Sequence, residues 1–296
     1  MNLPSAFLTR MQEMLGEEYE AFLQSYESGH YQSLRLNPRK TDREEFMEKS
    51  PFHLTPVAWE KNGFYYSEED TPGKHPYHEA GVYYIQEASA MAPVGYLDVQ
   101  PGDYVLDLCA APGGKTILLA EQMQGTGELY SCDAAENRVG LIRTAVDRMG
   151  FTGVHTLCND ATKPNPALPM ADRILTDVPC SGLGILAKKP DLRYKKLEAA
   201  RQAELLATQA AILDTAAALL KAGGRLVYST CTIDPAENQQ QIAAFLQRHP
   251  EFAVCAPEVP LPAGMTAGEH GCLSVPTRTG MDGFFLCVLQ KAAATQ

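Results

Sequence analysis

The sequence lacks the features that mark membrane, secreted and zinc-binding proteins. No run approaches the roughly 18 apolar residues of a membrane-spanning helix, and residues 1–10 lack the apolar centre of a signal peptide. The eight cysteines include no C-x-x-C pair, so neither a zinc site nor a disulfide framework is indicated. We therefore expect a cytoplasmic protein with no membrane partner and no bound metal, and we expect it to be a monomer.

Basic residues are in the minority, with 25 Lys and Arg against 36 Asp and Glu, and the formal net charge is −11. This balance argues mildly against a polyanionic partner, because affinity for nucleic acids depends on Lys and Arg side chains that neutralise phosphates. Basic clusters do occur at residues 35–43 (RLNPRKTDR) and 188–196 (KKPDLRYKK). Each cluster is compatible with a solvated surface or with phosphate contacts.

The first part of the chain shows short and mixed elements rather than repeats or low-complexity segments. Apolar residues recur at helical spacing over residues 4–26, and the pattern then predicts a strand at 33–36 and a helix at 42–49. A chain of 296 residues fits one large or two modest domains. We expect a small α+β domain over residues 1–95.

The second part of the chain, residues 96–296, alternates strands with helices. This order is typical of a doubly wound, Rossmann-like α/β sheet that binds ligands at the carboxyl ends of its strands. The expected strands are 104–108, 128–132, 154–157, 173–176 and 225–229, and the expected helices lie near 115–123, 136–149, 197–221 and 235–248.

The segment VLDLCAAPGGKT at residues 105–116 joins a buried strand to a helix through a turn with almost no side chains. Such a turn lets a ligand lie against main-chain N–H groups at the start of the helix. A phosphate-binding loop, G-x-x-x-x-G-K-[ST], does not fit, because Cys109 stands at its first glycine and Pro112 removes an N–H from its middle. A nucleoside site needs an acidic residue after the second strand to hold ribose hydroxyls, and Asp133 stands there.

Polar residues and cysteines follow the other expected strands. Arg138 lies one turn into the helix after the second strand, and Asp160 follows the third strand, where a carboxylate can accept from the amine of a cofactor base. The fourth strand ends at Asp177 and Cys180, and the fifth ends at Cys231. Two cysteines at the tips of neighbouring strands favour covalent chemistry, although a lone cysteine there is usually a packing residue.

Three motifs, CAAPGGKT, DVPCSGLG and YSTCTIDPAEN, occur in an order and spacing similar to those of the Nop/Sun family of S-adenosylmethionine-dependent RNA cytosine-5 methyltransferases. Residues 3–23 and 72–91 also resemble the N-terminal part of its bacterial members that act on 16S ribosomal RNA. The resemblance implies a class I methyltransferase sheet of seven strands, with an antiparallel last strand at 284–289. It also implies an N-terminal RNA-binding domain similar to the RNA-recognition motif.

The resemblance further implies a role for each residue of the site. Cys231 is the thiol that attacks carbon 6 of cytosine, Cys180 assists proton removal and release, and Asp177 contacts the ring or the cofactor. Among the residues implied to bind S-adenosylmethionine, Asp133 holds the ribose and Asp160 the adenine. The remaining ones are Lys115 and Arg138, with the methionine end carried by Cys109, Ala110, Ala111, Pro112, Gly113 and Gly114.

The sequence leaves three alternatives open. In DNA cytosine-5 methyltransferases the thiol after proline attacks, which would exchange the roles of Cys180 and Cys231. The substrate can be transfer RNA rather than 16S ribosomal RNA. The chain can also be a non-catalytic RNA-binding or ribosome-assembly factor that keeps the fold.

Overall fold

A large sheet organises the computed structural model, which describes residues 3–25, 31–194, 199–256, 258–279 and 281–294. Within these ranges the sheet has nine strands, in the order β11-β12-β13-β9-β8-β5-β6-β7, with β10 paired to β13. The five expected strands are confirmed as parallel neighbours, and the last strand is antiparallel to β9 as predicted. Their bounds are Tyr104–Asp107 (β5), Glu128–Asp133 (β6), Val154–Cys158 (β7), Ala171–Asp177 (β8), Leu220–Thr230 (β9) and Phe284–Lys291 (β13).

The predicted number of seven strands is wrong, because three short strands extend the sheet beyond β13 or pair with it. These strands are Phe252–Val254 (β10), Thr266–Gly268 (β11) and Gly271–Ser274 (β12). Segments of three or four residues carry too little alternation to be recognised in a sequence.

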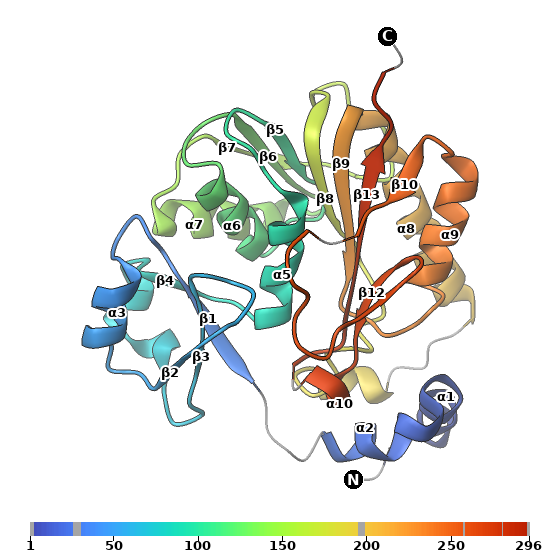
Figure 1. The fold of residues 1–296 in the computed structure, drawn as a ribbon, viewed down its shortest axis with the longest axis horizontal. Helices are drawn as coiled ribbons and strands as arrows, with labels where there is room; N and C mark the ends of the chain where they lie inside the picture. The colour runs from blue at the N-terminus through green and yellow to red at the C-terminus, as the bar shows by residue number, and fades with distance from the viewer. Residues whose placement is uncertain (1–2, 26–30, 195–198, 257, 280, 295–296) are drawn as a thin grey trace.

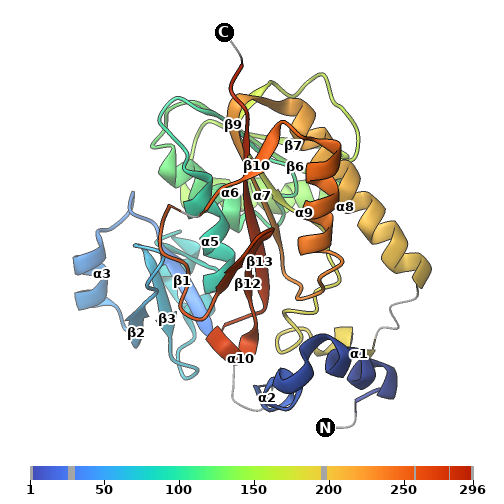
Figure 2. The ribbon, with the colours of Figure 1, turned by 45° about the vertical axis from the view of Figure 1, so that its right-hand side comes forward.

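Helices cover both faces of the large sheet, as Figures 1 and 2 show. Leu118, Ile142 and Val94 belong to the core on one face, and Ile212 and Phe245 belong to the core on the other. The helices of the first face are Ala88–Leu97 (α5), Gly114–Gln122 (α6) and Glu136–Met149 (α7), and those of the second are Ala199–Leu219 (α8) and Gln239–Arg248 (α9). The helix expected from residue 235 therefore begins at 239, after a turn. Residues 197–198 of the expected third helix lie outside the described residues. Among the described residues, no helix is both long and apolar enough to cross a membrane.

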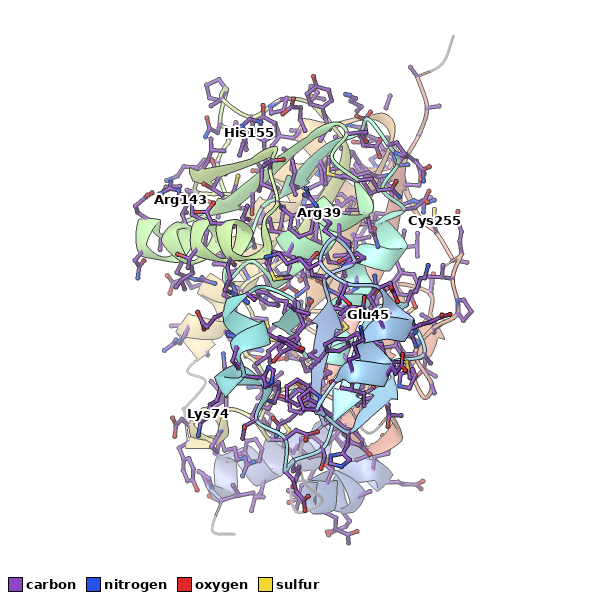
Figure 3. All side chains as sticks on the ribbon, turned by 90° about the vertical axis from the view of Figure 1, so that its left-hand side faces the viewer. Arg39, Glu45, Lys74, Arg143, His155 and Cys255 are labelled. Atoms are coloured by element: carbon purple, nitrogen blue, oxygen red, sulfur yellow. The ribbon has the colours of Figure 1, made fainter. Side chains whose placement is uncertain are left out.

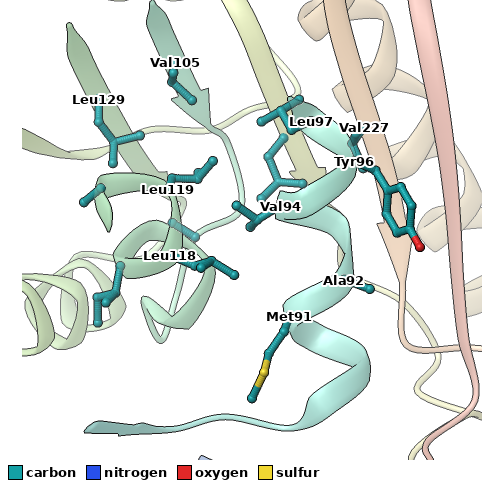
Figure 4. Packing of buried hydrophobic residues seen from close by; sticks show 14 of the residues in the cluster. Met91, Ala92, Val94, Tyr96, Leu97, Val105, Leu118, Leu119, Leu129 and Val227 are labelled. Carbon is teal, nitrogen blue, oxygen red and sulfur yellow. The ribbon is translucent and has the colours of Figure 1, made fainter. Parts of the chain in front are cut away.

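Helix α5 was not foreseen in the sequence. Figure 4 shows Met91, Val94 and Leu97 along it, with Leu118 and Leu119 of α6 close by. A helix that is apolar on nearly all sides is typical of an element buried between two layers, and it has no polar face to give a helical period. Here α5 packs both on the large sheet and on the N-terminal sheet.

The N-terminal domain contains a four-stranded antiparallel sheet in the order β2-β3-β1-β4. Leu34, Leu36 and Phe64 point from it toward Phe46 and form its core. Asp42 caps the predicted helix by accepting from the main-chain N–H of Glu45 at 2.8 Å. Its elements are Gln32–Leu36 (β1), Arg43–Lys49 (α3), Leu54–Pro56 (β2), Gly63–Tyr66 (β3), Pro72–Lys74 (η2), Pro76–Glu79 (α4) and Tyr83–Ile85 (β4).

The opposite face of this small sheet is covered by the larger domain. Arg35 is fully buried there and pairs with Glu121 of α6, while Nδ2 of Asn62 donates to the same carboxylate at 2.7 Å. The guanidinium of Arg39 lies 5.3 Å from the ring centroid of Phe151, where the two domains meet (Figure 3). Phosphate binding is therefore a wrong interpretation for Arg35, because strand alternation turns it onto a face that the second domain buries.

The helix expected over residues 4–26 is broken at Gly16, whose φ of 53° ends it. Phe7 and Phe22 of the resulting helices pack against Leu183 and Ile233 of the second domain. In Figure 1 these helices lie away from the small sheet and next to α10 (Pro276–Thr279). The helices are Ser5–Leu15 (α1), Gly16–Glu18 (η1) and Tyr19–Ser25 (α2), and residue 26 lies outside the described residues.

Candidate active site

The bare turn lies between the end of β5 and the start of α6. The N–H of Ala110 donates to the carbonyl of Cys132 at 2.8 Å, and the N–H of Gly113 donates to the carbonyl of Ala110 at 2.8 Å. Gly113 has a φ of 109°, which glycine adopts without strain, and the Ala111–Pro112 peptide bond is cis. The turn is thus fixed by main-chain hydrogen bonds within itself and to the end of β6.

Asp133, at the end of β6, is almost fully buried and is tied to this turn. Its Oδ1 accepts from the N–H of Ala135 at 3.2 Å, and its Oδ2 lies 3.4 Å from Nη2 of Arg138. The same Nη2 donates to the carbonyl of Ala111 at 3.0 Å. Arg138 therefore connects the turn to the carboxylate that the sequence assigned to a ribose.

The end of β7 carries a polar group that the sequence interpretation did not single out. Asn159 is buried, and its Nδ2 has no hydrogen-bond partner, although its Oδ1 accepts from Asn165 at 2.8 Å. The carboxylate of Asp160 instead accepts from the N–H and Oγ1 of Thr162, at 3.1 and 2.6 Å. These hydrogen bonds, with one from Lys163, lower the pKa of Asp160 to about 2. An unpartnered buried donor beside Asp133 signals a missing polar ligand.

Another buried carboxylate, Asp107, lies beneath the turn at the end of β5. Its Oδ2 accepts from Oγ1 of Thr116 at 2.8 Å, and its Oδ1 has no partner. Burial raises the pKa of Asp107 to about 7, and the negative charge of Asp177 adds to the shift, against opposing effects of Thr116 and Lys115.

These groups fit a nucleoside cofactor. The turn offers main-chain contact without side chains, Asp133 offers a carboxylate for hydroxyl groups, and Asn159 offers a free donor. The chemistry of this set matches S-adenosylmethionine better than a triphosphate. The described ranges contain no group of three or more His, Cys, Asp or Glu residues placed to hold a metal ion.

Lys115 and Asp177 form an ion pair at the floor of the site. Nζ of Lys115 lies 2.7 Å from Oδ2 of Asp177, and Oγ of Ser229 donates to Oδ1 of Asp177 at 2.7 Å. Burial acts to lower the pKa of Lys115, but the charges of Asp177 and Asp107 outweigh it and the pKa is raised. Lys115 therefore stays charged, and both oxygens of Asp177 have fixed partners.

The two candidate thiols meet at the neighbouring tips of β8 and β9. Sγ of Cys180 lies 3.1 Å from Sγ of Cys231, and both cysteines are free and partly buried. The hydrogen bond to Cys231, followed by burial, raises the pKa of Cys180 well above its ordinary value. The shift favours the protonated form of Cys180. The prediction that the two thiols lie together at neighbouring strand tips is confirmed.

Buried polar side chains hold the loop around Cys231. Asn238 accepts from Oγ1 of Thr230 at 2.7 Å and donates through Nδ2 to the carbonyl of Thr232 at 2.9 Å. One side chain thus fixes the residues on both sides of Cys231. The carbonyl of Cys231 also accepts from the N–H of Gly184 at 3.0 Å, which joins this loop to the one that follows Cys180.

Glu237 fixes the loop around Cys180 in a similar way. Its Oε2 accepts from the N–H of Ser181 and from Nε2 of Gln209, each at 2.9 Å. Burial raises the pKa of Glu237, while the hydrogen bonds from Ser181 and Gln209 oppose that shift. Glu237 and Asn238 were not assigned a role in the sequence, although they end the motif YSTCTIDPAEN, because no periodic pattern shows what a buried polar residue in a loop contacts.

The basic loop after the second motif is only partly available to a polyanion. Nζ of Lys188 lies 2.8 Å from Oδ2 of Asp282 and 3.7 Å from Oε1 of Glu87. Burial and the charge of Glu87 raise the pKa of Asp282 to about 6, against the opposing charge of Lys188. Lys188 thus has two carboxylate partners within the protein, which oppose its interpretation as a phosphate ligand. Lys189 is exposed, and residues 195–196 of the cluster lie outside the described residues.

The sheet order, the bare turn after β5 and the polar strand ends together define the Rossmann-like fold of class I methyltransferases. Residues 94–290 match the family described as 16S rRNA methyltransferase RsmB/F, and residues 3–88 match the N-terminal domain of 16S rRNA methyltransferase RsmF. The chain belongs to this family of S-adenosylmethionine-dependent ribosomal RNA methyltransferases, which confirms the resemblance noted in its motifs.

Individual relatives give the same result. The chain is 37% identical over 273 residues to the probable ribosomal RNA small subunit methyltransferase B of Bacillus subtilis, covering 88% of the chain and 60% of the relative. It is 34% identical over 307 residues to the ribosomal RNA small subunit methyltransferase F of Erwinia tasmaniensis, covering 98% and 64%. The chain thus spans less than two thirds of the length of these relatives.

Solved structures share the fold along nearly the whole chain. The crystal structure of PH0851 superposes with a TM-score of 0.90 at 33% identity, covering 98% of this chain and 66% of that one. NSun6 from Pyrococcus horikoshii, solved with SFG, gives 0.86 at 20% identity, covering 98% and 99%. At that identity the second likeness concerns the fold alone.

Proposed function

We propose that this protein transfers the methyl group of S-adenosylmethionine to carbon 5 of a cytosine in 16S ribosomal RNA, and that it does so in the cytoplasm. The observation that carries this proposal is the pair of thiols, Cys180 and Cys231, whose Sγ atoms lie 3.1 Å apart. Asp177, the ion-pair partner of Lys115, ends the strand that precedes Cys180. Family membership supports the substrate, and the paired thiols support the position that is methylated.

Carbon 5 of cytosine is a weak nucleophile, which is why a thiol is needed. Addition of the Cys231 thiolate to carbon 6 forms an S–C6 bond and moves electron density onto carbon 5 and N3. S-adenosylmethionine, when bound, supplies the methyl group as a sulfonium. Carbon 5 would then bond to that methyl carbon as the methyl–sulfur bond of the cofactor breaks, and the electron pair of the broken bond would stay on the cofactor sulfur. The proton on carbon 5 then leaves to a base, the C5–C6 double bond re-forms, and the Cys231 thiolate is released.

We assign the attack to Cys231 and the later steps to Cys180. The raised pKa of Cys180 supports this order, because a thiol that keeps its proton is a poor nucleophile. The adduct removes the Cys231 thiol, which is the largest cause of that raised pKa, so Cys180 can then lose its proton and assist removal of the carbon 5 proton and release of the adduct.

Asp177 and Lys115 act together in this proposal. Asp177 contacts the cytosine ring or the cofactor, while Lys115 and Ser229 hold its carboxylate in one orientation. Asp133 and Arg138, together with Asp160 and residues 109–114, hold the cofactor. We add Asn159 to this set because it precedes Asp160 in the chain and its buried Nδ2 donor has no hydrogen-bond partner.

The assignment is tested by replacing each thiol and following covalent RNA adducts on a denaturing gel. Cys180→Ser should accumulate an adduct with unmethylated 16S ribosomal RNA, and Cys231→Ser should give none. The reverse pattern would assign the attack to Cys180. Both variants should bind S-adenosylmethionine as the wild type does, which controls for folding.

The class of activity is tested by transfer of tritiated methyl groups. RNA from cells that lack this modification should be labelled by the wild type and not by Cys231→Ala. Label in transfer RNA instead of 16S ribosomal RNA would change the substrate. Cofactor binding with no label in any RNA would favour a non-catalytic RNA-binding or ribosome-assembly factor. Bisulfite sequencing of the labelled RNA would then identify the cytosine.

A further inference from the structure

A cavity of about 760 Å³ lies between α1, the first turns of α8 and η3 (Pro190–Tyr194). Its volume is within the range of roughly 300–1,000 Å³ that binding sites for small organic groups occupy. Figure 2 shows α1 beneath the beginning of α8, so the N-terminal helices close one side of the space. None of the motifs assigned to the cofactor accounts for this cavity.

The cavity begins at the reaction centre and extends away from the cofactor residues. Pro179, Cys180 and Ser181 line one side of it. Within the part of the chain that the structure describes, its lining includes neither Lys115 nor the bare turn at residues 109–114. A cytosine that contacts both the Cys231 thiol and the methyl donor therefore lies at the edge of the cavity. The next nucleotide of a continuous RNA chain can then reach into the cavity.

One exposed arginine at the cavity is available to an anionic occupant. Arg10, Arg193 and Arg201 line the cavity, and Glu204 is the one acidic residue that the described lining includes. Arg10 pairs with Asp234, and the buried Arg193 donates through Nη2 to the carbonyl of Leu186 at 2.8 Å. Arg201 is exposed and is the arginine that a phosphate can reach. Guanidinium groups bind phosphates through paired hydrogen bonds and also stack on bases.

The walls suit a flat base. Phe7, Leu183 and Leu192 contribute apolar surface, and Tyr194 contributes an aromatic ring that is 58% exposed. Proteins that bind single-stranded RNA combine basic side chains along the backbone with aromatic side chains on which bases stack. An aromatic ring beside arginines matches that combination better than it matches a protein partner, whose interface would bury a larger apolar patch.

We propose that this cavity binds a nucleotide that flanks the target cytosine in single-stranded RNA, with its base against Tyr194 and its phosphate near Arg201. The inference rests on the proposed methylation of RNA and adds a subsite to it. A cytosine must leave its stack before a thiol can reach carbon 6, so a pocket for the neighbouring nucleotide would hold the opened strand in place.

The test measures binding of a fluorescently labelled oligocytidylate, a single-stranded probe that requires no knowledge of the natural site. Tyr194→Ala and Arg201→Glu should each weaken binding about fivefold or more, the effect expected from loss of one stacked base or one phosphate contact. Both side chains are exposed, so the unfolding temperature and the affinity for S-adenosylmethionine should not change. Matched controls are Tyr104→Ala, an exposed tyrosine at the start of β5, and Arg143→Glu on α7.

Each outcome decides between possibilities. Weaker RNA binding in the two cavity variants alone supports the inference, and KM for unmethylated 16S ribosomal RNA should rise more than kcat falls. Unchanged RNA binding in an enzyme that still methylates RNA overturns the inference and leaves the proposed function intact. A lower affinity for S-adenosylmethionine in Tyr194→Ala would make the cavity part of the cofactor site. If the wild type neither binds nor methylates RNA, the proposed function fails and the inference fails with it.

Discussion

Gly184 and Gly283 approach each other so closely that a β-carbon on Gly184 would lie 1.9 Å from the carbonyl oxygen of Gly283. The N–H of Gly283 donates to the carbonyl of Gly184 at 2.8 Å, and the N–H of Gly184 donates to the carbonyl of Cys231 at 3.0 Å. The loop after Cys180 is therefore held between the end of β9 and the residues that precede β13.

Gly184→Ala should displace this loop, because the added methyl group meets backbone atoms that cannot rotate away. We expect a loss of about 1–3 kcal/mol in the free energy of unfolding, together with a large loss of methyl transfer. Denaturant unfolding and methyl-transfer assays measure the two effects. Gly140→Ala is the control, since a β-carbon at that helical position meets nothing within 4 Å. Equal behaviour of the two variants would contradict the tight approach.

Lys115→Met should leave the carboxylate of Asp177 with Ser229 as its remaining side-chain partner. The pair is mostly buried, with side-chain exposures of 13% and 28%, so we expect a loss of about 1–3 kcal/mol in stability. Methyl transfer should fall further, because Asp177 loses its orientation. Lys49→Met removes an exposed pair with Glu45 and should not change the unfolding temperature. Full activity in Lys115→Met would refute the role given to this pair.

Asp107 should make the stability of the protein depend on pH. Its pKa of about 7 in the folded protein lies above the ordinary value of 3.8, so the folded state keeps a proton that the unfolded chain releases. Stability from this group is complete below about pH 4 and decreases as the pH rises toward 7, with a slope of at most about 1.4 kcal/mol per pH unit. Asp107→Asn lacks this slope, so its stability relative to the wild type should rise between pH 4 and 7. Unfolding at several pH values measures the difference, and a constant difference would exclude the effect.

Asn159→Ala should weaken the binding of S-adenosylmethionine without destabilising the free protein much. The substitution removes a buried donor that has no partner, so folding loses little, but the ligand loses a hydrogen bond. We expect the dissociation constant to rise about tenfold in calorimetric titrations. An unchanged constant would show that Nδ2 of Asn159 faces away from the ligand.

The sequence predicted the parts of this protein that have a period or a motif. Alternating strands and helices after residue 103 located the large sheet, and the motif cysteines at two strand ends were correctly expected to lie close together. Parallel strands explain this success, because their carboxyl ends meet at one edge of the sheet. The roles of Cys180, Cys231 and the cofactor residues remain predictions, as does the domain boundary at residue 95.

The sequence did not predict features that depend on distant partners. Helix α5 lacks a polar face, and Glu237 and Asn238 act through hydrogen bonds that no spacing reveals. Lys188 is basic in sequence, yet its charge is neutralised by Asp282, which lies far along the chain. A sequence displays charge and periodicity, but only the folded chain shows which charges meet.

The pairing of the buried Arg35 with Glu121 closes one face of the N-terminal sheet. In RNA-recognition motifs a face of the sheet binds the bases, but here this face packs on the second domain. The N-terminal sheet is therefore a fixed part of the interface between the two domains. An exchange of N-terminal domains between relatives would have to preserve both Arg35 and Glu121, because the contact surfaces of the two domains are complementary.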